Sequence, residues 1–238
     1  MDVFIVSGGS KGLGAALVKK CLSMKKTVFS LSRTHGDGFF IQCDLSKPED
    51  IDKVFLKISH KIEESLVSSI TLINNAAVIE PIGPVTEFEM SQIVYNINVN
   101  FTGTILLSRH YMKYIQDFEI PKKIINISSG AALDPYGGWS LYCAAKAGIE
   151  HFVRSVALEQ QLKLFPVSIL NISPGIMDTD MQKIIRKTKV DKFPLVDLFR
   201  KFKKNRDLQP PDKVAQLIID AICFKTFASG STVALADL

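Results

Sequence analysis

The sequence has few residues that can build a disulfide scaffold or a metal site. It contains four cysteines and four histidines in 238 residues, and both types are scattered along the chain. They form no C-x-x-C pair and no cluster at the spacing of zinc ligands, so no metal is expected. Four cysteines are also too few for a disulfide framework, which predicts reduced thiols as in the cytoplasm.

Long apolar runs and an export signal are missing as well. No uninterrupted hydrophobic segment approaches the ~20 residues that span a bilayer. The first residues, MDVFIVSGGSKGLG, contain neither the basic segment nor the apolar segment of a signal peptide. The sequence therefore predicts a soluble, cytoplasmic protein that has no membrane partner.

A strong excess of one charge is absent too. Lysine and arginine number 29 against 24 aspartates and glutamates, which gives a formal net charge of +5. This excess is too diffuse to indicate a nucleic-acid partner, although it favours anionic small molecules. The hydrophobic content of 47% is enough to bury a core, and no linker or repeat divides the chain. We therefore expect a single domain over residues 1–238.

Short β-branched or apolar runs alternate with longer segments of helical period, which predicts an α/β fold. Strands are expected at residues 3–7, 27–32, 39–43, 70–74, 123–128, 167–172 and 232–235. Helices are expected at residues 13–24, 48–66, 87–97, 99–117, 141–165 and 211–224. Together these elements predict a parallel sheet of seven strands that is covered by helices on both faces.

Residues 176–208 interrupt this alternation. They follow the sixth expected strand and mix apolar side chains, among them Met177, Met181 and Phe193, with lysines and arginines. The segment predicts an inserted pair of helices. Open α/β sheets bind ligands at the carboxyl ends of their strands, so the insertion is expected to form a helical lid over a substrate. A solvated amphipathic helix pair is the alternative.

A glycine-rich turn follows the first expected strand and precedes an apolar helix. Gly8, Gly12 and Gly14 are spaced G-x-x-x-G-x-G, which differs from the G-x-G-x-x-G pattern of ordinary dinucleotide folds. Glycine permits a tight turn and a close approach of backbone to a pyrophosphate, whose charge is stabilised at a helix amino terminus. The turn predicts a nucleotide site, with a plain structural turn as the alternative.

The end of the second expected strand indicates which dinucleotide is bound. An NAD-selective site usually has an acidic residue there to bind the ribose 2′-hydroxyl, whereas this chain has Ser32 followed by Arg33. Together with Lys11 in the glycine turn, Arg33 suits a 2′-phosphate through charge-assisted hydrogen bonds. NADP(H) is therefore predicted in preference to NAD(H). The alternative is that both cations are ordinary exposed residues.

Three side chains of the second half of the chain suit acid–base chemistry. Tyr142 and Lys146 are one helical turn apart, and Ser129 follows the fifth expected strand on the side of the glycine turn. At ~4 Å and an effective dielectric constant near 20, a lysine cation stabilises a tyrosinate by ~4 kcal/mol, or roughly three pKa units. The phenol pKa is then expected near neutrality, which suits a general acid.

Five motifs occur in order along the chain. Residues 7–14 look like T-G-x-x-x-G-x-G, and residues 74–77 look like N-N-A-G. Asn100 then matches a single conserved position, Ser129 precedes the Y-x-x-x-K of residues 142–146, and residues 174–179 resemble P-G-x-x-x-T. With these motifs the chain resembles the short-chain dehydrogenase/reductase family over essentially its whole length. The resemblance implies a doubly wound, seven-stranded Rossmann fold that binds a nicotinamide cofactor, for which the residues after the second strand favour NADP(H).

The same resemblance implies a role for each matching residue. Tyr142 would protonate the carbonyl oxygen of a ketone substrate, and Ser129 would hydrogen-bond that oxygen. Lys146 would bind the nicotinamide ribose and lower the Tyr142 pKa, and Asn100 would hold the water of a proton relay. The cofactor would contact Ser7, Gly8, Ser10, Lys11, Gly12, Leu13, Gly14, Ser32, Arg33, Asp44, Leu45, Asn75, Tyr142, Lys146, Pro174, Gly175, Ile176 and Thr179.

Two positions depart from the family pattern. Ser7 stands where the family has threonine, and it keeps a hydroxyl group for the turn. Ala77 replaces the last glycine of N-N-A-G, and its methyl group is tolerated only if φ is negative there.

Within the family, the stretches SLSRTH, INISSGAALDPYGGWSLYCAAKAG and PGIMDTDMQ look most like bacterial benzil reductases of the (S)-benzoin-forming type. This likeness implies NADPH-dependent reduction of one ketone of an aromatic or vicinal diketone. Trp139, Met177 and Met181 would then line an apolar substrate pocket. A lone tryptophan is also commonly a packing residue.

Other functions stay open at the level of sequence. A reductase of 3-oxoacyl thioesters or of a pterin side-chain ketone would use the same catalytic residues, and residues 183–206 would dock an acidic carrier protein. A non-catalytic NADPH-binding sensor would not need the three catalytic side chains, all of which are present. Nucleic-acid binding through residues 183–206 lacks a recognition motif. In this family subunits pack through the helices expected at 99–117 and 141–165, which implies a homodimer or homotetramer.

Overall fold

The computed structural model describes residues 1–62 and 66–237. These residues form a seven-stranded parallel sheet in the order β3-β2-β1-β4-β5-β6-β7, which confirms the predicted doubly wound α/β fold. The strand order reverses between β1 and β4, and ligands of such sheets bind in the crevice at this point. The strands are β1 (Asp2–Ser7), β2 (Thr27–Ser32), β3 (Phe39–Gln42), β4 (Ser69–Asn74), β5 (Lys122–Ile127), β6 (Ser168–Ser173) and β7 (Thr232–Ala234).

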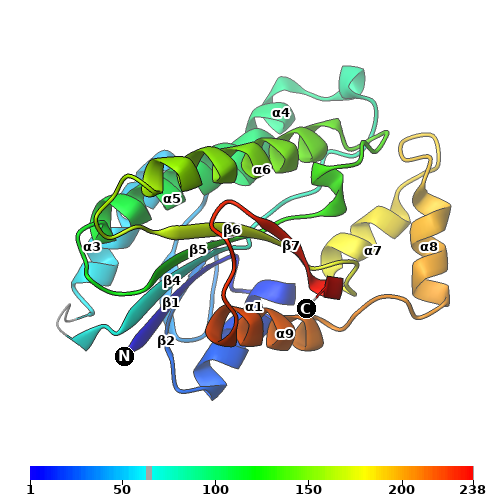
Figure 1. The fold of residues 1–238 in the computed structure, drawn as a ribbon. Helices are drawn as coiled ribbons and strands as arrows, with labels where there is room; N and C mark the ends of the chain where they lie inside the picture. Colours follow the sequence, from blue (N-terminus) through cyan, green and yellow to red (C-terminus); the bar gives the residue numbers. More distant parts are fainter. Residues whose placement is uncertain (63–65, 238) are drawn as a thin grey trace.

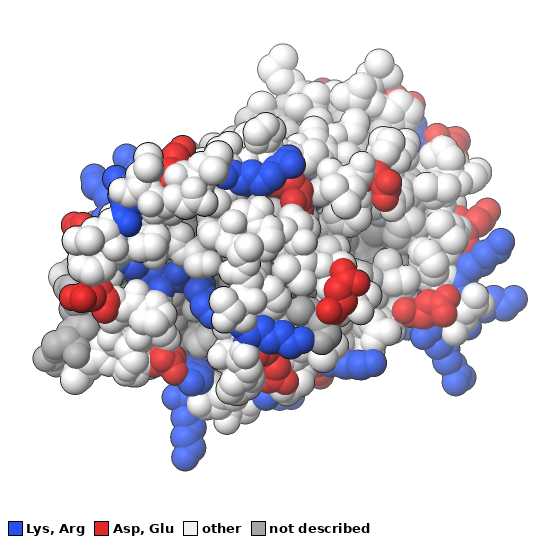
Figure 2. Space-filling view, viewed as in Figure 1, with Lys and Arg blue, Asp and Glu red and all other residues white. Residues whose placement is uncertain are grey.

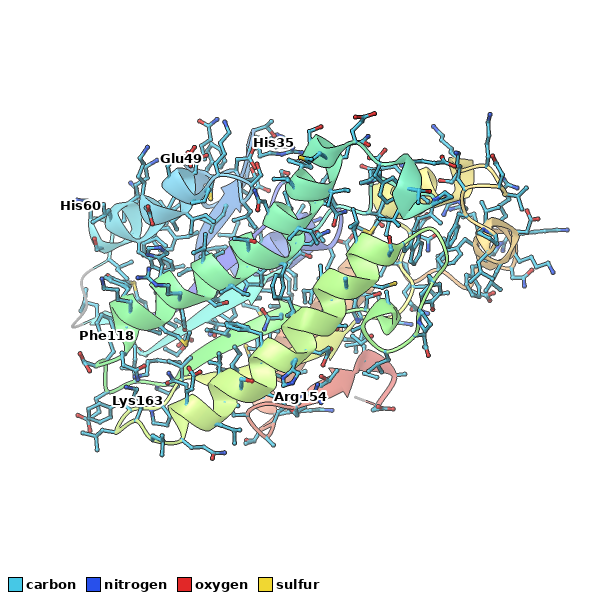
Figure 3. All side chains as sticks on the ribbon, turned by 90° about the horizontal axis from the view of Figure 1, so that it is seen from above. His35, Glu49, His60, Phe118, Arg154 and Lys163 are labelled. Atoms are coloured by element: carbon cyan, nitrogen blue, oxygen red, sulfur yellow. The ribbon has the colours of Figure 1, made fainter. Side chains whose placement is uncertain are left out.

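Helices cover both faces of the sheet (Figure 1). One face is covered by α1 (Gly12–Ser23) and α9 (Pro211–Phe224). The other is covered by α2 (Pro48–Asp52), α3 (Val54–Ser59), α4 (Met90–Ile97), α5 (Gly103–Ile115) and α6 (Ser140–Gln160). In Figure 3, α5 and α6 run side by side, and the labelled Phe118 and Lys163 mark the end at which both helices finish.

The continuous apolar runs of the strands follow from this double cover. Successive strand side chains point to opposite faces, so a strand that is buried on both sides needs an apolar residue at every position. In β1, Val3 and Ile5 pack in the core under α5 and α6, whereas Phe4 and Val6 pack in the core with α1 and α9. The sheet is thereby fixed between two apolar layers.

Three predicted helices have different limits in the structure. The helix expected at 48–66 is two short helices, α2 and α3, and part of that prediction falls on residues 63–65, outside the described residues. The helix expected at 99–117 opens with a π-helical turn at Asn98–Thr102 and continues as α5. The helix expected at 141–165 stops at Gln160, whose Oε1 accepts a hydrogen bond from the Val167 N–H at 2.8 Å and so turns the chain toward β6.

Two helices follow β6, as the sequence predicts for residues 176–208. They are α7 (Asp180–Lys187) and α8 (Val196–Lys204), and they lie beyond the carboxyl ends of the strands (Figure 1). The two ends of the insertion are joined, because the Gln209 N–H donates to the Ile176 carbonyl at 2.9 Å and the Asp178 N–H donates to the Gln209 carbonyl at 3.0 Å. The insertion therefore leaves and re-enters the fold at one point.

The surface carries mixed charge. In Figure 2, acidic and basic side chains lie among uncharged ones over the face in view. Within residues 1–62 and 66–237, no group of three or more histidine, cysteine, aspartate or glutamate side chains is placed to hold a metal ion. The labelled His35 and His60 stand well apart in Figure 3. None of the described helices is both long enough and apolar enough to cross a membrane.

Candidate active site

A cavity of about 490 Å³ opens at the carboxyl ends of the strands. Its walls come from the β1–α1 turn, the ends of β2, β4 and β5, the start of α6 and the segment from β6 into α7. Of the predicted site residues, Ser7, Gly14 and Asn100 do not line it. Those that do are Gly8, Ser10, Lys11, Gly12, Leu13, Ser32, Arg33, Asp44, Leu45, Asn75, Ser129, Trp139, Tyr142, Lys146, Pro174, Gly175, Ile176, Met177, Thr179 and Met181.

Ser7 and Asn75 hold the glycine turn from beneath. The Ser7 hydroxyl oxygen accepts hydrogen bonds from the N–H groups of Asn75 at 3.0 Å and Ala76 at 3.2 Å, so the hydroxyl kept at this position does brace the turn. Asn75 Nδ2 donates to the Ser7 carbonyl at 3.0 Å. A Cβ on Gly14 would lie 2.0 Å from the Gly8 carbonyl oxygen, which explains why only glycine fits there.

Two glycines, Gly12 and Gly175, leave backbone without side chains beside this turn. Gly12, with φ +55°, is the first residue of α1, and Lys11 before it makes no side-chain cap to the helix. The first amides of a helix need partners from outside the helix. Gly175, with φ +76°, lies after β6, and a Cβ built there would meet nothing within 4 Å. Uncapped amides beside bare glycine backbone form a cradle that suits a pyrophosphate.

Arg33 lies at the rim of the cavity and is held in place by Tyr95. The Arg33 Nη1 donates to the Tyr95 hydroxyl, in α4, at 2.8 Å. Gln42 Nε2 donates to the Arg33 carbonyl at 3.2 Å and so fixes the backbone. A guanidinium has five N–H donors, so one bond to Tyr95 orients the group and leaves others for a phosphate.

Asp44 and Ser32 line the same end of the cavity, and each binds a nearby backbone group. Asp44 Oδ1 accepts from the Ser46 N–H at 3.0 Å and from the Ser46 hydroxyl at 2.8 Å. The Ser32 hydroxyl donates to the His35 carbonyl. Both side chains therefore shape the loops that follow β2 and β3.

Ser129, Tyr142 and Lys146 meet at the inner part of the cavity. Tyr142 is in the first turn of α6 and Lys146 is one turn further along, with exposed fractions of 7% and 8%. Ser129 and Tyr142 both line the cavity, and the Ser129 side chain acts on the phenol to lower its pKa. Lys146 Nζ donates to the Ile127 carbonyl at 2.6 Å and lies 5.7 Å from the centre of the Tyr142 ring. The structure thus brings the predicted acid and its two predicted neighbours together.

Burial controls the ionisation of this group. It raises the pKa of Tyr142 to about 12, and the Ser129 side chain opposes this rise only in part. It lowers the pKa of Lys146 to about 8, against the opposing effect of the Glu150 charge. The near-neutral phenol pKa expected from the sequence is therefore wrong. The cost of burying a phenolate decides the direction of the shift, and the Lys146 ammonium is directed to the Ile127 carbonyl.

Asn100 lies outside the cavity, in the π-helical turn, and its amide is bound to protein. Its Oδ1 accepts from the Val78 N–H at 2.8 Å, and its Nδ2 donates to the Val78 carbonyl at 2.8 Å and to Asn96 Oδ1 at 2.9 Å. The side chain therefore positions the segment after β4. The sequence predicts only that Asn100 holds a relay water, and not this structural role. Ala77 in that segment is not among the non-glycine residues with positive φ, so its methyl group is accommodated.

Aromatic side chains form a wall beside Tyr142. The Trp139 ring meets the Tyr142 ring edge-on at 6.0 Å and stacks on Phe193, with centroids 4.6 Å apart and planes 7° from parallel. Tyr136 and Phe199 approach Trp139 at 5.0 and 5.3 Å. Trp139 consequently lines the cavity and also packs against the insertion that carries Phe193 and Phe199.

Comparison with known proteins identifies the family of this fold and site. The sequence model described as short chain dehydrogenase matches residues 2–190, well over half of the chain. The chain belongs to the short-chain dehydrogenase family. It is accordingly an NAD(P)-dependent oxidoreductase.

Individual relatives support this assignment over the full length. The chain is 34% identical to a benzil reductase ((S)-benzoin forming) of Bacillus cereus, with 100% of both chains covered. It is 35% identical to a protein of the same name from Bacillus subtilis (strain 168), with 93% of each covered. Among solved structures, the KRED1-Pglu enzyme superposes with a TM-score of 0.85 at 25% identity, covering 98% of this chain and 100% of that one.

Sequence reasoning missed several residues of this short-chain dehydrogenase site. Tyr95 and Tyr136, together with Ile79 and Ile185, line the cavity but belong to none of the motifs. They come from α4, from the segments after β4 and β5, and from the insertion, and only folding brings these parts together. Tyr95 carries no local signal, because its partner Arg33 lies far away along the chain.

Proposed function

We propose that the protein is an NADPH-dependent carbonyl reductase that reduces one ketone of an aromatic or vicinal diketone, as in the conversion of benzil to (S)-benzoin. The proposal depends on one observation: the buried Tyr142 and the aromatic side chains around Trp139 line the same cavity. The two benzil reductase relatives, at 34% and 35% identity, support the same substrate class.

The cavity residues fit a phosphorylated dinucleotide. The cradle of glycine backbone and uncapped helix amides at Gly12 and Gly175 would hold the pyrophosphate. Asp44 and Leu45 would border the adenine, Lys146 would bind the nicotinamide ribose, and residues 174–179 would line the remaining wall. When bound, the cofactor supplies the hydride.

Arg33 supports NADP(H) over NAD(H). Its guanidinium stands at the rim of the cavity, oriented by the Tyr95 hydroxyl at 2.8 Å. Planar guanidinium donors match phosphate oxygens, whereas a ribose 2′-hydroxyl is usually bound by a carboxylate. Ser32 and Lys11 also line this part of the cavity.

Tyr142 is the proposed proton donor. Its pKa, raised to about 12 by burial, keeps the phenol protonated at every physiological pH, which is the state that a general acid needs before it acts. Ser129, which lines the cavity beside Tyr142, would donate to the same carbonyl oxygen. As that oxygen gains the proton, charge develops on the phenol, and the Lys146 ammonium stabilises this charge.

The aromatic wall favours an aryl ketone. Trp139 and Phe199 line the cavity together with Tyr136, and their ring faces and edges provide apolar contact area for a phenyl group. Met177 and Met181 add adaptable apolar side chains. A charged acyl-carrier substrate needs no such wall.

Residues 176–208 are proposed to act as the lid over this wall. Phe199 and Ile185 reach the cavity from the insertion. The loop between α7 and α8 is fastened to the other side of the site, because Lys192 forms an ion pair with Glu87 and its carbonyl lies against Gly138. A Cβ on Gly138 would lie 2.4 Å from that carbonyl oxygen.

The test is the loss of NADPH absorbance when benzil is added to the purified protein, followed by chiral chromatography of the product. We expect turnover with NADPH, much slower turnover with NADH, and (S)-benzoin as the product. NADPH that binds without being consumed by benzil would refute the substrate class, and 3-oxoacyl thioesters and pterins would then be tried. Absence of NADPH binding would refute the cofactor assignment.

A further inference from the structure

Glu150 is a buried acidic residue that the proposed mechanism does not use. It lies on α6 one turn beyond Lys146, which is itself one turn beyond Tyr142, and only 8% of its surface is exposed. Residues one turn apart share a face of a helix, so three ionisable side chains follow one another along this face. A buried acid needs partners for its charge, which makes its surroundings informative.

The Glu150 carboxylate binds groups from three neighbouring strands. Its Oε1 accepts a hydrogen bond from the Ser128 hydroxyl, at the end of β5, at 2.6 Å. Its Oε2 accepts from Asn171 Nδ2 in β6 at 3.0 Å and from the Thr232 hydroxyl in β7. All three donors are neutral, and acceptance at both oxygens is the pattern of an ionised carboxylate. Ser128 precedes Ser129, so the carboxylate also fixes the strand end that carries the catalytic hydroxyl.

Lys146 is the buried cation one helical turn before Glu150 on α6. Its Nζ donates to the carbonyl of Ile127, in β5, at 2.6 Å. On α6 it lies between Tyr142 and Glu150. From β6 and β7 come Asn171 and Thr232, neutral groups that bind Glu150. Within the described part of the chain, Glu150 is the charged group that acts on the Lys146 pKa, raising it against the effect of burial.

We propose that Glu150 is a positioning residue of the hydride-transfer site, whose buried carboxylate keeps Lys146 charged and ties the end of β5 to β6 and β7. This inference rests on the proposed role of Lys146 in carbonyl reduction. A nearby opposite charge favours the charged form of a buried lysine, whereas burial alone favours the neutral form. Without the Glu150 charge, Lys146 loses its proton at lower pH and no longer stabilises a phenolate at Tyr142.

The direct test is the titration of Lys146 by NMR in protein labelled with ¹³C in its lysine side chains. The Lys146 signal is assigned by its loss in Lys146→Arg. In Glu150→Gln we expect the midpoint to fall by about one pH unit, a tenfold change in the proton dissociation constant. An unchanged midpoint overturns the proposal. This titration needs neither substrate nor cofactor, so it stands even if benzil is not the substrate.

Thr232→Val is the matched control. It removes one donor to the Glu150 carboxylate but leaves the negative charge in place. We expect its Lys146 midpoint to stay within about 0.3 units of wild type, because the Coulomb interaction is retained. An equal fall in both variants means that the hydrogen-bond network, and not the charge, sets the Lys146 titration, and it overturns the proposal.

A kinetic readout separates positioning from a merely structural role. In Glu150→Gln the fall of kcat for ketone reduction at high pH should begin about one pH unit lower than in wild type. The rates of the two proteins should therefore converge at pH 6 and differ about tenfold above pH 8. A loss of equal size at every pH is the result of a structural defect and contradicts the proposal.

A folding defect in Glu150→Gln has its own test. If the cause is an uncompensated buried cation, the double variant Glu150→Gln/Lys146→Met should recover folded protein, as judged by circular dichroism and thermal melting. A double variant that folds no better than Glu150→Gln overturns the proposal, because the defect then does not involve the Lys146 charge.

Discussion

At the scale of single residues, burial sets the ionisation of the site more strongly than the charge of neighbouring groups does. The raised pKa of Tyr142 and the lowered pKa of Lys146 have the same first cause, which is the cost of placing a charge away from water. Tyr142 consequently stays protonated. Lys146 is charged at neutral pH, but its pKa of about 8 lies only slightly above that pH. Both states are those that a ketone reductase needs.

Replacing the proposed acid should abolish most of the activity. Tyr142→Phe removes the hydroxyl but keeps the ring against Trp139. General acid catalysis contributes about 10²- to 10⁴-fold, so kcat for benzil should fall by at least about 100-fold. NADPH binding, measured by fluorescence, should change little. A variant with more than a tenth of the wild-type kcat would show that the proton comes from elsewhere.

The rate of reduction should fall as the pH rises through about 8. The pKa of Lys146 is lowered to about 8, so the ammonium is charged below this pH and neutral above it. Tyr142, with its pKa raised to about 12, stays protonated over the same range and adds no fall of its own. The measurement is kcat for benzil between pH 6 and 10. A rate that rises with pH would contradict this sign.

The Tyr95 hydroxyl should contribute to NADPH binding and not to NADH binding. Tyr95→Phe removes the 2.8 Å hydrogen bond that orients Arg33, and a net loss of about 0.5–1.5 kcal/mol corresponds to a KM for NADPH raised about two- to tenfold. Calorimetry with adenosine 2′,5′-bisphosphate should show the same loss without catalysis. Tyr136→Phe, at a cavity residue that packs against Trp139, is the control. Equal effects on NADPH and NADH would rule out a 2′-phosphate contact.

At the scale of elements, helix limits are decided by tertiary partners. A helix is expected from residue 99, yet the chain forms a π-helical turn at Asn98–Thr102, where Asn100 binds both backbone groups of Val78. In the same way, α6 stops where Gln160 binds the Val167 N–H. Helical periodicity cannot reveal such bonds, since their partners are distant along the chain.

The packing of the insertion should depend on Phe193. This side chain is fully buried and stacks on Trp139, so Phe193→Ala should destabilise the protein by about 3–5 kcal/mol in urea unfolding. KM for benzil should also rise as the α7–α8 unit loosens. Phe224→Ala, at a side chain that is 76% exposed, should cost less than about 0.5 kcal/mol. Similar losses in the two variants would contradict the packing seen here.

At the scale of the whole molecule, the sheet gathers distant segments into one site. The cavity lies where the strand order reverses, so the turns after β1, β2, β4, β5 and β6 all face it. The insertion borders one end of the cavity without disturbing the sheet, because it leaves and returns beside Met177 and Gln209. A dinucleotide and a small ketone can both be held by such a crevice.

Cofactor binding should raise the free energy of unfolding of the whole chain. A ligand present at 100 times its Kd adds about 2.7 kcal/mol to the free energy of unfolding. NADPH should therefore raise the melting temperature more than NADH at equal concentration, and Arg33→Ala should remove most of that difference. An equal shift with both cofactors in the wild-type protein would refute NADP(H) selectivity.

The parallel sheet, the glycine turn and the proposed catalytic residues were all predictable from the order of the residues alone. Alternating apolar runs and helices fix a parallel sheet because both faces must be buried, and the motif residues are local neighbours whose spacing survives folding, as for Tyr142 and Lys146. Folding alone reveals the pairing of Arg33 with Tyr95, the hydrogen bonds of Glu150 and the raised pKa of Tyr142. These depend on long-range contacts and on burial, which arise only when distant segments pack together.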